Sequence, residues 1–110
     1  MTMPIEEFEK VDIRVGRIIQ IDDFPEAKKP AYKLRIDFGE FGVKNSSARI
    51  VDLYTKEELL NKLVVCVTNL TPRKIGPFLS EVLTTGFYRP DGAVVLAIPE
   101  RDAPLGAKLG

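Results

Sequence analysis

Apolar and polar residues alternate along much of the chain, and this pattern predicts strands. Between Val11 and Ile21 the apolar residues fall on one face, while Arg14 and Gln20 fall on the other. The apolar positions of this stretch are Val11, Ile13, Val15, Ile19 and Ile21. Gly16 interrupts it, and a glycine inside a long strand is typical of a bulge or a sharp bend. We therefore expect one bent strand that serves both sides of a small barrel.

A second strand is predicted from Tyr32 to Phe38, where the alternation is strict. One face carries the apolar residues Tyr32, Leu34, Ile36 and Phe38, and the other carries Lys33, Arg35 and Asp37. We expect the apolar face to point into the core and the outer face to be charged. A third strand is expected from Ser46 to Val51, where the pattern is less clear.

A short helix is predicted after Thr55, because Thr55 and Glu58 have the spacing of a capping box. Its apolar stripe is Leu59, Leu60 and Leu63, so we expect about two turns. Further strands are expected at 64–70, 82–87 and 93–98, with a loop at 71–77 and a turn at 90–92. This order predicts an all-β, five-stranded OB-fold (Greek-key) barrel with the helix between strands 3 and 4 and short terminal extensions. That fold often binds oligonucleotides.

The length and charge of the chain set limits on this picture. Its 110 residues, 45% of them hydrophobic, predict a single domain over residues 1–110 with one core. A core of this size has a thin stability margin, which favours association. The 16 basic and 16 acidic residues cancel, so no whole-molecule field draws the protein to a polyanion. Any RNA site must be a local patch.

The residue types present exclude most catalytic chemistry. The chain has no histidine and one cysteine, Cys66, which lies in an apolar run and is expected to be a buried, unreactive side chain. Imidazole-based catalysis and the usual zinc sites are therefore excluded, and no glycine-rich phosphate loop is present. We expect no enzymatic activity, no metal and no cofactor.

The amino terminus lacks a basic segment followed by an apolar stretch, so the sequence gives no indication of secretory cleavage. No apolar run approaches the roughly 18 residues that a membrane span needs. We expect a cytoplasmic protein without membrane insertion.

Two basic clusters are the candidate RNA-binding sites. Lys28, Lys29, Lys33 and Arg35 lie on the first strand connection and the outer face of the second strand, and Arg73-Lys74 lies on the loop after Leu70. Their donors suit phosphate oxygens, although cations in such places are most often simply solvated. Exposed aromatic residues are scarce, which favours recognition of RNA shape over stacking on splayed bases.

Four segments closely resemble the CsaA family, and the resemblance covers essentially the entire chain. The segments are residues 8–16 (FEKVDIRVG), 27–39 (AKKPAYKLRIDFG), 46–48 (SSA) and 72–83 (PRKIGPFLSEVL). CsaA proteins belong to a wider group of tRNA-binding domains. The resemblance implies an OB-fold homodimer, tRNA binding at the level of the group, and a chaperone activity linked to export of unfolded precursor proteins.

The resemblance also implies individual site residues. The tRNA-binding signature of the wider group matches Asn69, Leu70, Pro72, Arg73 or Lys74, and Ser80. Asn69 and Ser80 could equally stabilise a strand end or a turn. Arg49 stands where glutamine is usual in the CsaA branch, and it adds a positive charge to a strand that borders the expected groove.

Both chain ends carry apolar residues that predict a subunit interface. Ile5 and Phe8 are spaced for one turn of an amphipathic helix, and Pro104, Leu105 and Leu109 lie in an apolar tail. We expect both ends to contribute to a homodimer. Pairing two copies of each basic cluster would raise avidity for RNA by roughly 10²-fold where the geometry permits.

Two function classes therefore remain. As an RNA-binding module, the protein would bind tRNA or another structured RNA through its cations, with an affinity that falls steeply with salt. As a chaperone, it would bind unfolded precursor proteins, with contacts to the export machinery, through exposed apolar residues. Leu70, Phe78 and Leu79 are the candidate peptide-binding residues.

Overall fold

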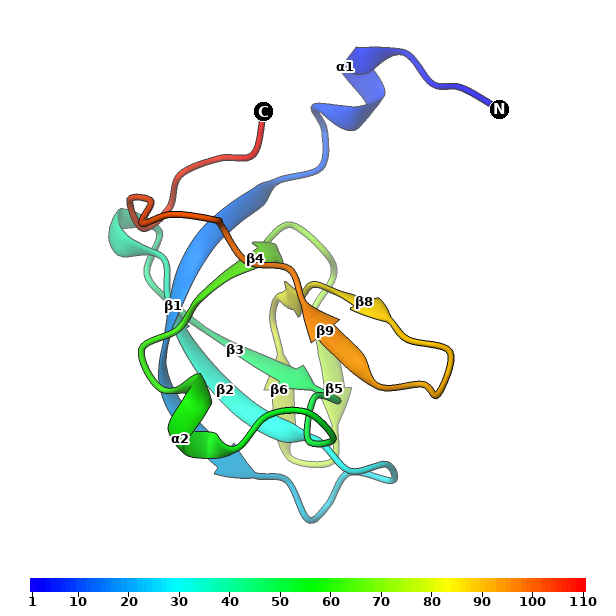
Figure 1. Cartoon of the computed structure of the whole chain (residues 1–110). Helices are drawn as coiled ribbons and strands as arrows, with labels where there is room; N and C mark the ends of the chain where they lie inside the picture. The colour runs from blue at the N-terminus through cyan, green and yellow to red at the C-terminus, as the bar shows by residue number, and fades with distance from the viewer.

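Five strands form a strongly curved antiparallel sheet in the order β3-β2-β1-β4-β7, in a computed structural model that describes residues 1–110 (Figure 1). The strands are β1 (Ile13–Asp23), β2 (Tyr32–Asp37), β3 (Val43–Ala48), β4 (Leu63–Val67) and β7 (Leu83–Thr84). The sheet closes because the backbone N–H of Glu81 donates to the carbonyl of Asn45 at 2.8 Å, which joins the chain before β7 to β3. The nearly closed barrel confirms the predicted OB-fold class.

The remaining elements, two hairpins and three helical turns, lie outside the five-stranded sheet. Two hairpins are formed by β5 (Arg73–Ile75) with β6 (Phe78–Ser80), and by β8 (Gly86–Tyr88) with β9 (Val94–Leu96). The helical turns are α1 (Ile5–Phe8), α2 (Lys56–Leu59) and the 3-10 turn η1 (Gly39–Phe41). No helix is of the length and apolar character that crossing a membrane requires.

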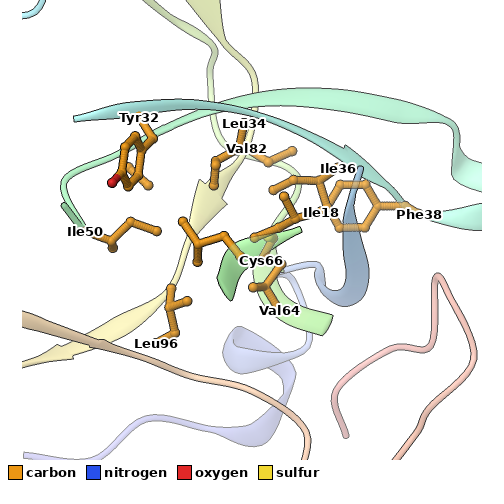
Figure 2. Close-up of a cluster of buried hydrophobic side chains, with 12 residues drawn as sticks. Ile18, Tyr32, Leu34, Ile36, Phe38, Ile50, Val64, Cys66, Val82 and Leu96 are labelled. Atoms are coloured by element: carbon orange, nitrogen blue, oxygen red, sulfur yellow. The ribbon is translucent and has the colours of Figure 1, made fainter. Parts of the chain in front are cut away.

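Strand β2 supplies the centre of the core, as its alternation predicts. Leu34 and Ile36 are fully buried and Phe38 nearly so, and they pack with Ile18, Val64 and Cys66 from the neighbouring strands (Figure 2). Arg35 on the opposite face is exposed. Cys66 is buried, as expected, and burial raises the pKa of its thiol to about 12.

Strand β1 pairs with strands on both sides of the barrel, as predicted, but the side chains that it buries are not all on the predicted face. Residues 13–17 pair with β4 and residues 17–23 pair with β2. The bulge lies at Ile19, where the register shifts, and not at Gly16. The extra residue reverses which side chains point inward, so Ile18 is fully buried and Ile19 is 40% exposed.

Gly16 has a different function from the one the sequence predicts. A Cβ atom at this position would lie 2.5 Å from Cγ2 of Ile36 and 2.7 Å from Cε1 of Phe38. Only glycine allows these two core side chains to cross the β1 backbone so closely.

The capping box is confirmed, and the helix it begins is shorter than predicted. The Glu58 N–H donates to Oγ1 of Thr55, and the Thr55 N–H donates to the Glu58 carboxylate at 2.9 Å. Helix α2 is a single turn that buries Leu59 and leaves Leu60 half exposed, because the chain turns at Asn61 with a φ of 69°.

Other boundaries also differ from the predictions. Strand β3 begins at Val43 and ends at Ala48, earlier at both ends than the predicted strand. The predicted loop at 71–77 contains β5 and the turn of the β5–β6 hairpin. Gly76, with a φ of 57°, makes the turn of this hairpin possible.

Both terminal segments adjoin the start of β1, with α1 leading into this strand and the carboxyl-terminal tail beside it (Figure 1). Helix α1 forms where Ile5 and Phe8 predict a helical turn. The carboxyl-terminal tail runs along the open edge of β1, where the N–H of Leu109 donates to the carbonyl of Ile13 and the N–H of Val15 donates to that of Ala107. Part of the apolar tail is therefore already paired within the chain.

Candidate nucleic-acid interface

A cleft of about 880 Å³ opens between the β1–β2 connection, the end of β3 and the two hairpins. It falls where OB-folds present their binding loops. Its lining includes small or apolar residues, among them Ala31, Ala48, Ile50, Ile75, Leu83 and Val94. The cleft therefore combines apolar side chains with charged and polar ones.

The lining of the cleft brings together cations from three segments that are distant in the sequence. Lys28 and Lys29 come from the β1–β2 connection, Arg49 follows β3, and Arg73 and Lys74 come from β5. One carboxylate, that of Glu26, also lines the cleft. The neutral chain thus carries an excess of four positive charges at this cleft, where low-dielectric walls strengthen their combined field.

The predicted RNA-binding cations are free of ion pairs. Six ion pairs in the structure each use a different lysine or arginine, out of 16 in the chain. None of the six involves a predicted RNA-binding cation, namely Lys28, Lys29, Lys33, Arg35, Arg49, Arg73 or Lys74. No carboxylate of the protein therefore has to release these charges before they bind a ligand.

Lys33 and Arg35 lie on the outer face of β2 and do not line the cleft. The Lys33 ammonium group is 5.5 Å from the ring centroid of Phe24 and 6.0 Å from that of Phe78. The two rings meet edge to face at 5.3 Å, so this cluster fastens the β1–β2 connection to β6. Lys33 therefore helps to shape one wall of the cleft from behind.

Asn69 is held by hydrogen bonds inside the protein. Its Oδ1 accepts from the N–H of Asp12 at 2.9 Å, and its Nδ2 donates to the carbonyl of Lys10 at 2.7 Å. Both polar ends of the side chain are thus used to tie the end of β4 to the segment before β1. The geometry favours the strand-end interpretation of this residue.

Ser80 is buried, and its Oγ accepts a hydrogen bond from the N–H of Ser47 at 3.0 Å. This bond joins β6 to β3 at the side of the barrel that the sheet leaves open. The side chain is only 4% exposed and does not line the cleft, so its position also favours a structural interpretation.

Of the candidate peptide-binding residues, Phe78 and Leu79 lie in β6, and Leu70 lies in the loop that precedes β5. Leu70 and Leu79 are about half exposed, whereas Phe78 is partly buried against Phe24. They do not line the cleft. Among the candidate interface residues, Ile5, Pro104 and Leu109 are exposed, and Phe8 and Leu105 are partly buried.

A smaller hollow of about 190 Å³ lies at the opposite end of β1. Here the Arg14 guanidinium stacks 3.9 Å over the Phe41 ring, donates to Asp12 and donates to the carbonyl of Gly106 at 2.8 Å. A hydrogen bond from the Thr68 hydroxyl, together with Arg14, holds the pKa of the Asp12 carboxyl below its usual value. These groups satisfy one another and anchor the tail to β1.

The sequence gives no signal for the wall that β8 and β9 contribute. Tyr88, Gly86, Gly92 and Val94 line the cleft. Nothing in the alternation of 82–98 indicates that this hairpin leaves the barrel and faces the β1–β2 connection. The juxtaposition follows from barrel closure, which only the folded chain reveals.

Comparisons with known proteins identify the family of the chain. Residues 13–108 match the family described as "Putative tRNA binding domain". The chain is 37% identical over 110 residues to the methionine--tRNA ligase of Pyrococcus abyssi, covering 99% of this chain and 15% of the ligase. It therefore spans about one seventh of the length of such curated relatives.

Two solved structures cover almost the whole chain. The chaperone CsaA of Bacillus anthracis superposes with a TM-score of 0.94 at 39% identity and covers 100% of both chains. The CsaA chaperone protein of Picrophilus torridus superposes with a TM-score of 0.90 at 46% identity and covers 99% of this chain and 100% of its own. The predicted resemblance is confirmed.

Proposed function

The chain belongs to the tRNA-binding domain family and has the fold of the CsaA chaperones, and from this premise we propose that it binds tRNA or another structured RNA through the basic cleft. The observation that carries the proposal is the gathering of Lys28, Lys29, Arg49, Arg73 and Lys74 around one cleft, none of them in an ion pair. Lysine and arginine are the usual ligands of phosphate oxygens.

The physical consequence is an affinity set by local charge. Each phosphate neutralised releases condensed counterions, so the logarithm of the binding constant falls linearly with the logarithm of the salt concentration. If three to five cleft cations each neutralise one phosphate, the slope per subunit is about −2 to −4. A neutral chain needs this local excess because its long-range attraction for RNA is small.

We further propose that two copies associate through the chain ends. Ile5 is 64% exposed and Leu109 is 49% exposed, and both belong to segments adjoining the start of β1. Burying them against a second copy would remove apolar surface from water and present two clefts to one RNA. Light scattering of the variant Ile5→Glu/Leu109→Glu is expected to give a monomer, and a stable dimer would refute this interface.

The RNA proposal is tested with labelled tRNA titrated at several salt concentrations. We expect Arg73→Ala/Lys74→Ala to weaken binding and to reduce the slope by about one to two per subunit. The matched control is Lys44→Ala/Lys62→Ala, which removes two cations that also lack ion pairs but lie outside the cleft. Equal slopes for both double variants would contradict a cleft-centred site.

A chaperone role is the second candidate, and the similarity to CsaA chaperones over the full chain supports it. In this role unfolded precursor proteins, delivered to or from export machinery, would contact the half-exposed Leu70 and Leu79 together with Phe78. Apolar binding tolerates salt, whereas phosphate binding does not. Binding of an unfolded polypeptide that persists at high salt, and that Leu70→Ser/Leu79→Ser abolishes, would establish it.

The proposal includes no catalytic step and no cofactor for this chain. Binding, positioning and release of RNA require only the cations and the fold described above. Because tRNA is a cytoplasmic ligand, we place the proposed activity in the cytoplasm.

A further inference from the structure

Tyr88 forms part of the cleft wall and is 83% exposed. In the β8–β9 hairpin Tyr88 pairs with Val94, and Phe87 pairs with Val95. Successive side chains of a strand point to opposite faces, so Tyr88 and Val94 share the face that lines the cleft, while Phe87 and Val95 share the other face. The ring of Tyr88 is thus directed at the same space as the cations.

The Tyr88 side chain makes no contact of the kind that ties the other tyrosines into the fold. The other two tyrosines of the chain are tied into the fold: the Tyr32 hydroxyl donates to the carbonyl of Tyr54 at 2.9 Å, and the Tyr54 hydroxyl accepts from the N–H of Leu96 at 3.0 Å. Tyr88 makes no side-chain hydrogen bond and no aromatic pair within the protein. An exposed ring beside unpaired cations is the combination that single-stranded nucleic-acid sites use.

We propose that the cleft binds an unpaired nucleotide whose base stacks on Tyr88 while its flanking phosphates contact Arg49, Arg73 and Lys74. This inference rests on the proposed RNA-binding function and specifies which part of the RNA is recognised. The cleft, at about 880 Å³, is within the size range of small-ligand sites and can hold a nucleotide. Small apolar residues in its lining, Ala31 and Ala48 among them, leave room for a flat base.

Base stacking on Tyr88 selects against duplex RNA. In a helix both faces of a base are covered by its neighbours, whereas loops, bulges and ends can present a free face. The ligand is therefore RNA with an unpaired nucleotide beside a structured region, and not an uninterrupted helix. This differs from the prediction from sequence, which favoured recognition of shape because exposed aromatic residues are scarce.

The charge of the cleft also favours RNA over an export signal as its occupant. Secretory signal peptides begin with a positively charged region. Five unpaired cations and a single carboxylate at the cleft would repel such a segment and attract phosphates. Competition between a basic signal peptide and RNA is therefore included in the test.

The test uses the full chain and two RNAs with the same number of phosphates. One is a single-stranded oligonucleotide with a central 2-aminopurine, whose fluorescence falls when the base stacks on an aromatic ring, and the other is a blunt duplex. We expect the oligonucleotide to be quenched by the protein and to bind about 10-fold more tightly than the duplex. The signal peptide is expected not to displace it.

Substitutions then assign the effect to the ring. We expect Tyr88→Ala to weaken oligonucleotide binding about 10-fold, to abolish the quenching and to leave the salt slope unchanged. Tyr88→Phe keeps the ring and is expected to bind within about twofold of the original chain. Phe87→Ala, which removes an exposed ring from the opposite face of the same hairpin, is the matched control and is expected to keep both affinity and quenching.

Several results would overturn the proposal. These are an unchanged affinity or retained quenching in Tyr88→Ala, equal binding of duplex and single strand, an equal loss in Phe87→Ala, or displacement of the RNA by the signal peptide. If tRNA still binds with the salt slope of the basic cleft, only the stacking inference fails. If the original chain binds no RNA at low salt, the proposed function itself fails.

Discussion

Substitution of Ser80 by alanine separates the two interpretations of this residue. The resemblance to the tRNA-binding group predicts that Ser80 contacts RNA, whereas the structure buries it and uses its Oγ to accept from the N–H of Ser47. Alanine removes the acceptor and leaves that N–H without its partner at the closure between β6 and β3. An unsatisfied group of this kind costs about 1–3 kcal/mol.

Urea unfolding measures this cost. A domain of this size has a denaturant dependence of about 1–3 kcal/mol per molar urea, so the midpoint is expected to fall by roughly 1 M without a change in slope. Since small domains are stable by only about 5–15 kcal/mol, this is a substantial loss. The folded fraction of Ser80→Ala is expected to bind tRNA with unchanged salt dependence.

The control for this prediction is Ser47→Ala. It removes a neighbouring hydroxyl that makes no hydrogen bond within the protein, and it keeps the backbone N–H that Ser80 accepts from. Its unfolding midpoint is expected to stay close to that of the original chain. If Ser80→Ala retains full stability and loses tRNA affinity, Ser80 contacts the RNA and the structural interpretation is wrong.

Two further predictions concern stability. Gly16→Ala places a methyl group 2.7 Å from the Phe38 ring, and this overpacking is expected to cost about 1–3 kcal/mol in urea unfolding, so an unchanged midpoint would contradict the packing described. The hydrogen bond from Thr68 lowers the pKa of Asp12 below its usual 3.8, so Asp12 contributes stability above that pH and loses it as the pH falls through the lowered value. In an acid titration followed by circular dichroism, Asp12→Asn is therefore expected to be less stable than the original chain at neutral pH and less sensitive to acid. If the substitution lowers stability equally at neutral pH and at a pH below the lowered pKa, this reasoning is refuted.

The sequence predicts the strands that alternate without interruption and fails where one residue changes the register. Strand β2 is predicted correctly because its inner and outer faces never exchange. The predicted face of β1 is wrong because the bulge at Ile19 reverses the alternation. The bulge depends on how β1 pairs with β2, where Ile18 is opposite Ile36 and Gln20 is opposite Arg35. The sequence predicts a loop at 71–77, where Pro72, Gly76 and Pro77 occur, and so misses β5 and the turn that joins it to β6.

The candidate site shows a similar division. The basic residues could be predicted individually, but their convergence could not, because Lys28, Arg49 and Arg73 come from separate segments that only barrel closure brings together. Asn69 matches the signature of the tRNA-binding group, and the structure adds that both of its amide atoms are bonded internally. The aromatic wall at Tyr88 depends on the orientation of a hairpin that local pattern does not specify.

Amide hydrogen exchange with and without tRNA tests the central claim most directly, since it reports which backbone segments the RNA covers. We expect slower exchange at 26–29, 47–50 and 73–76, the three segments that carry the cations of the cleft, and unchanged exchange at 57–63 and 100–103. Protection confined to the latter segments, or absent from the cleft under conditions where tRNA is bound, would contradict the account.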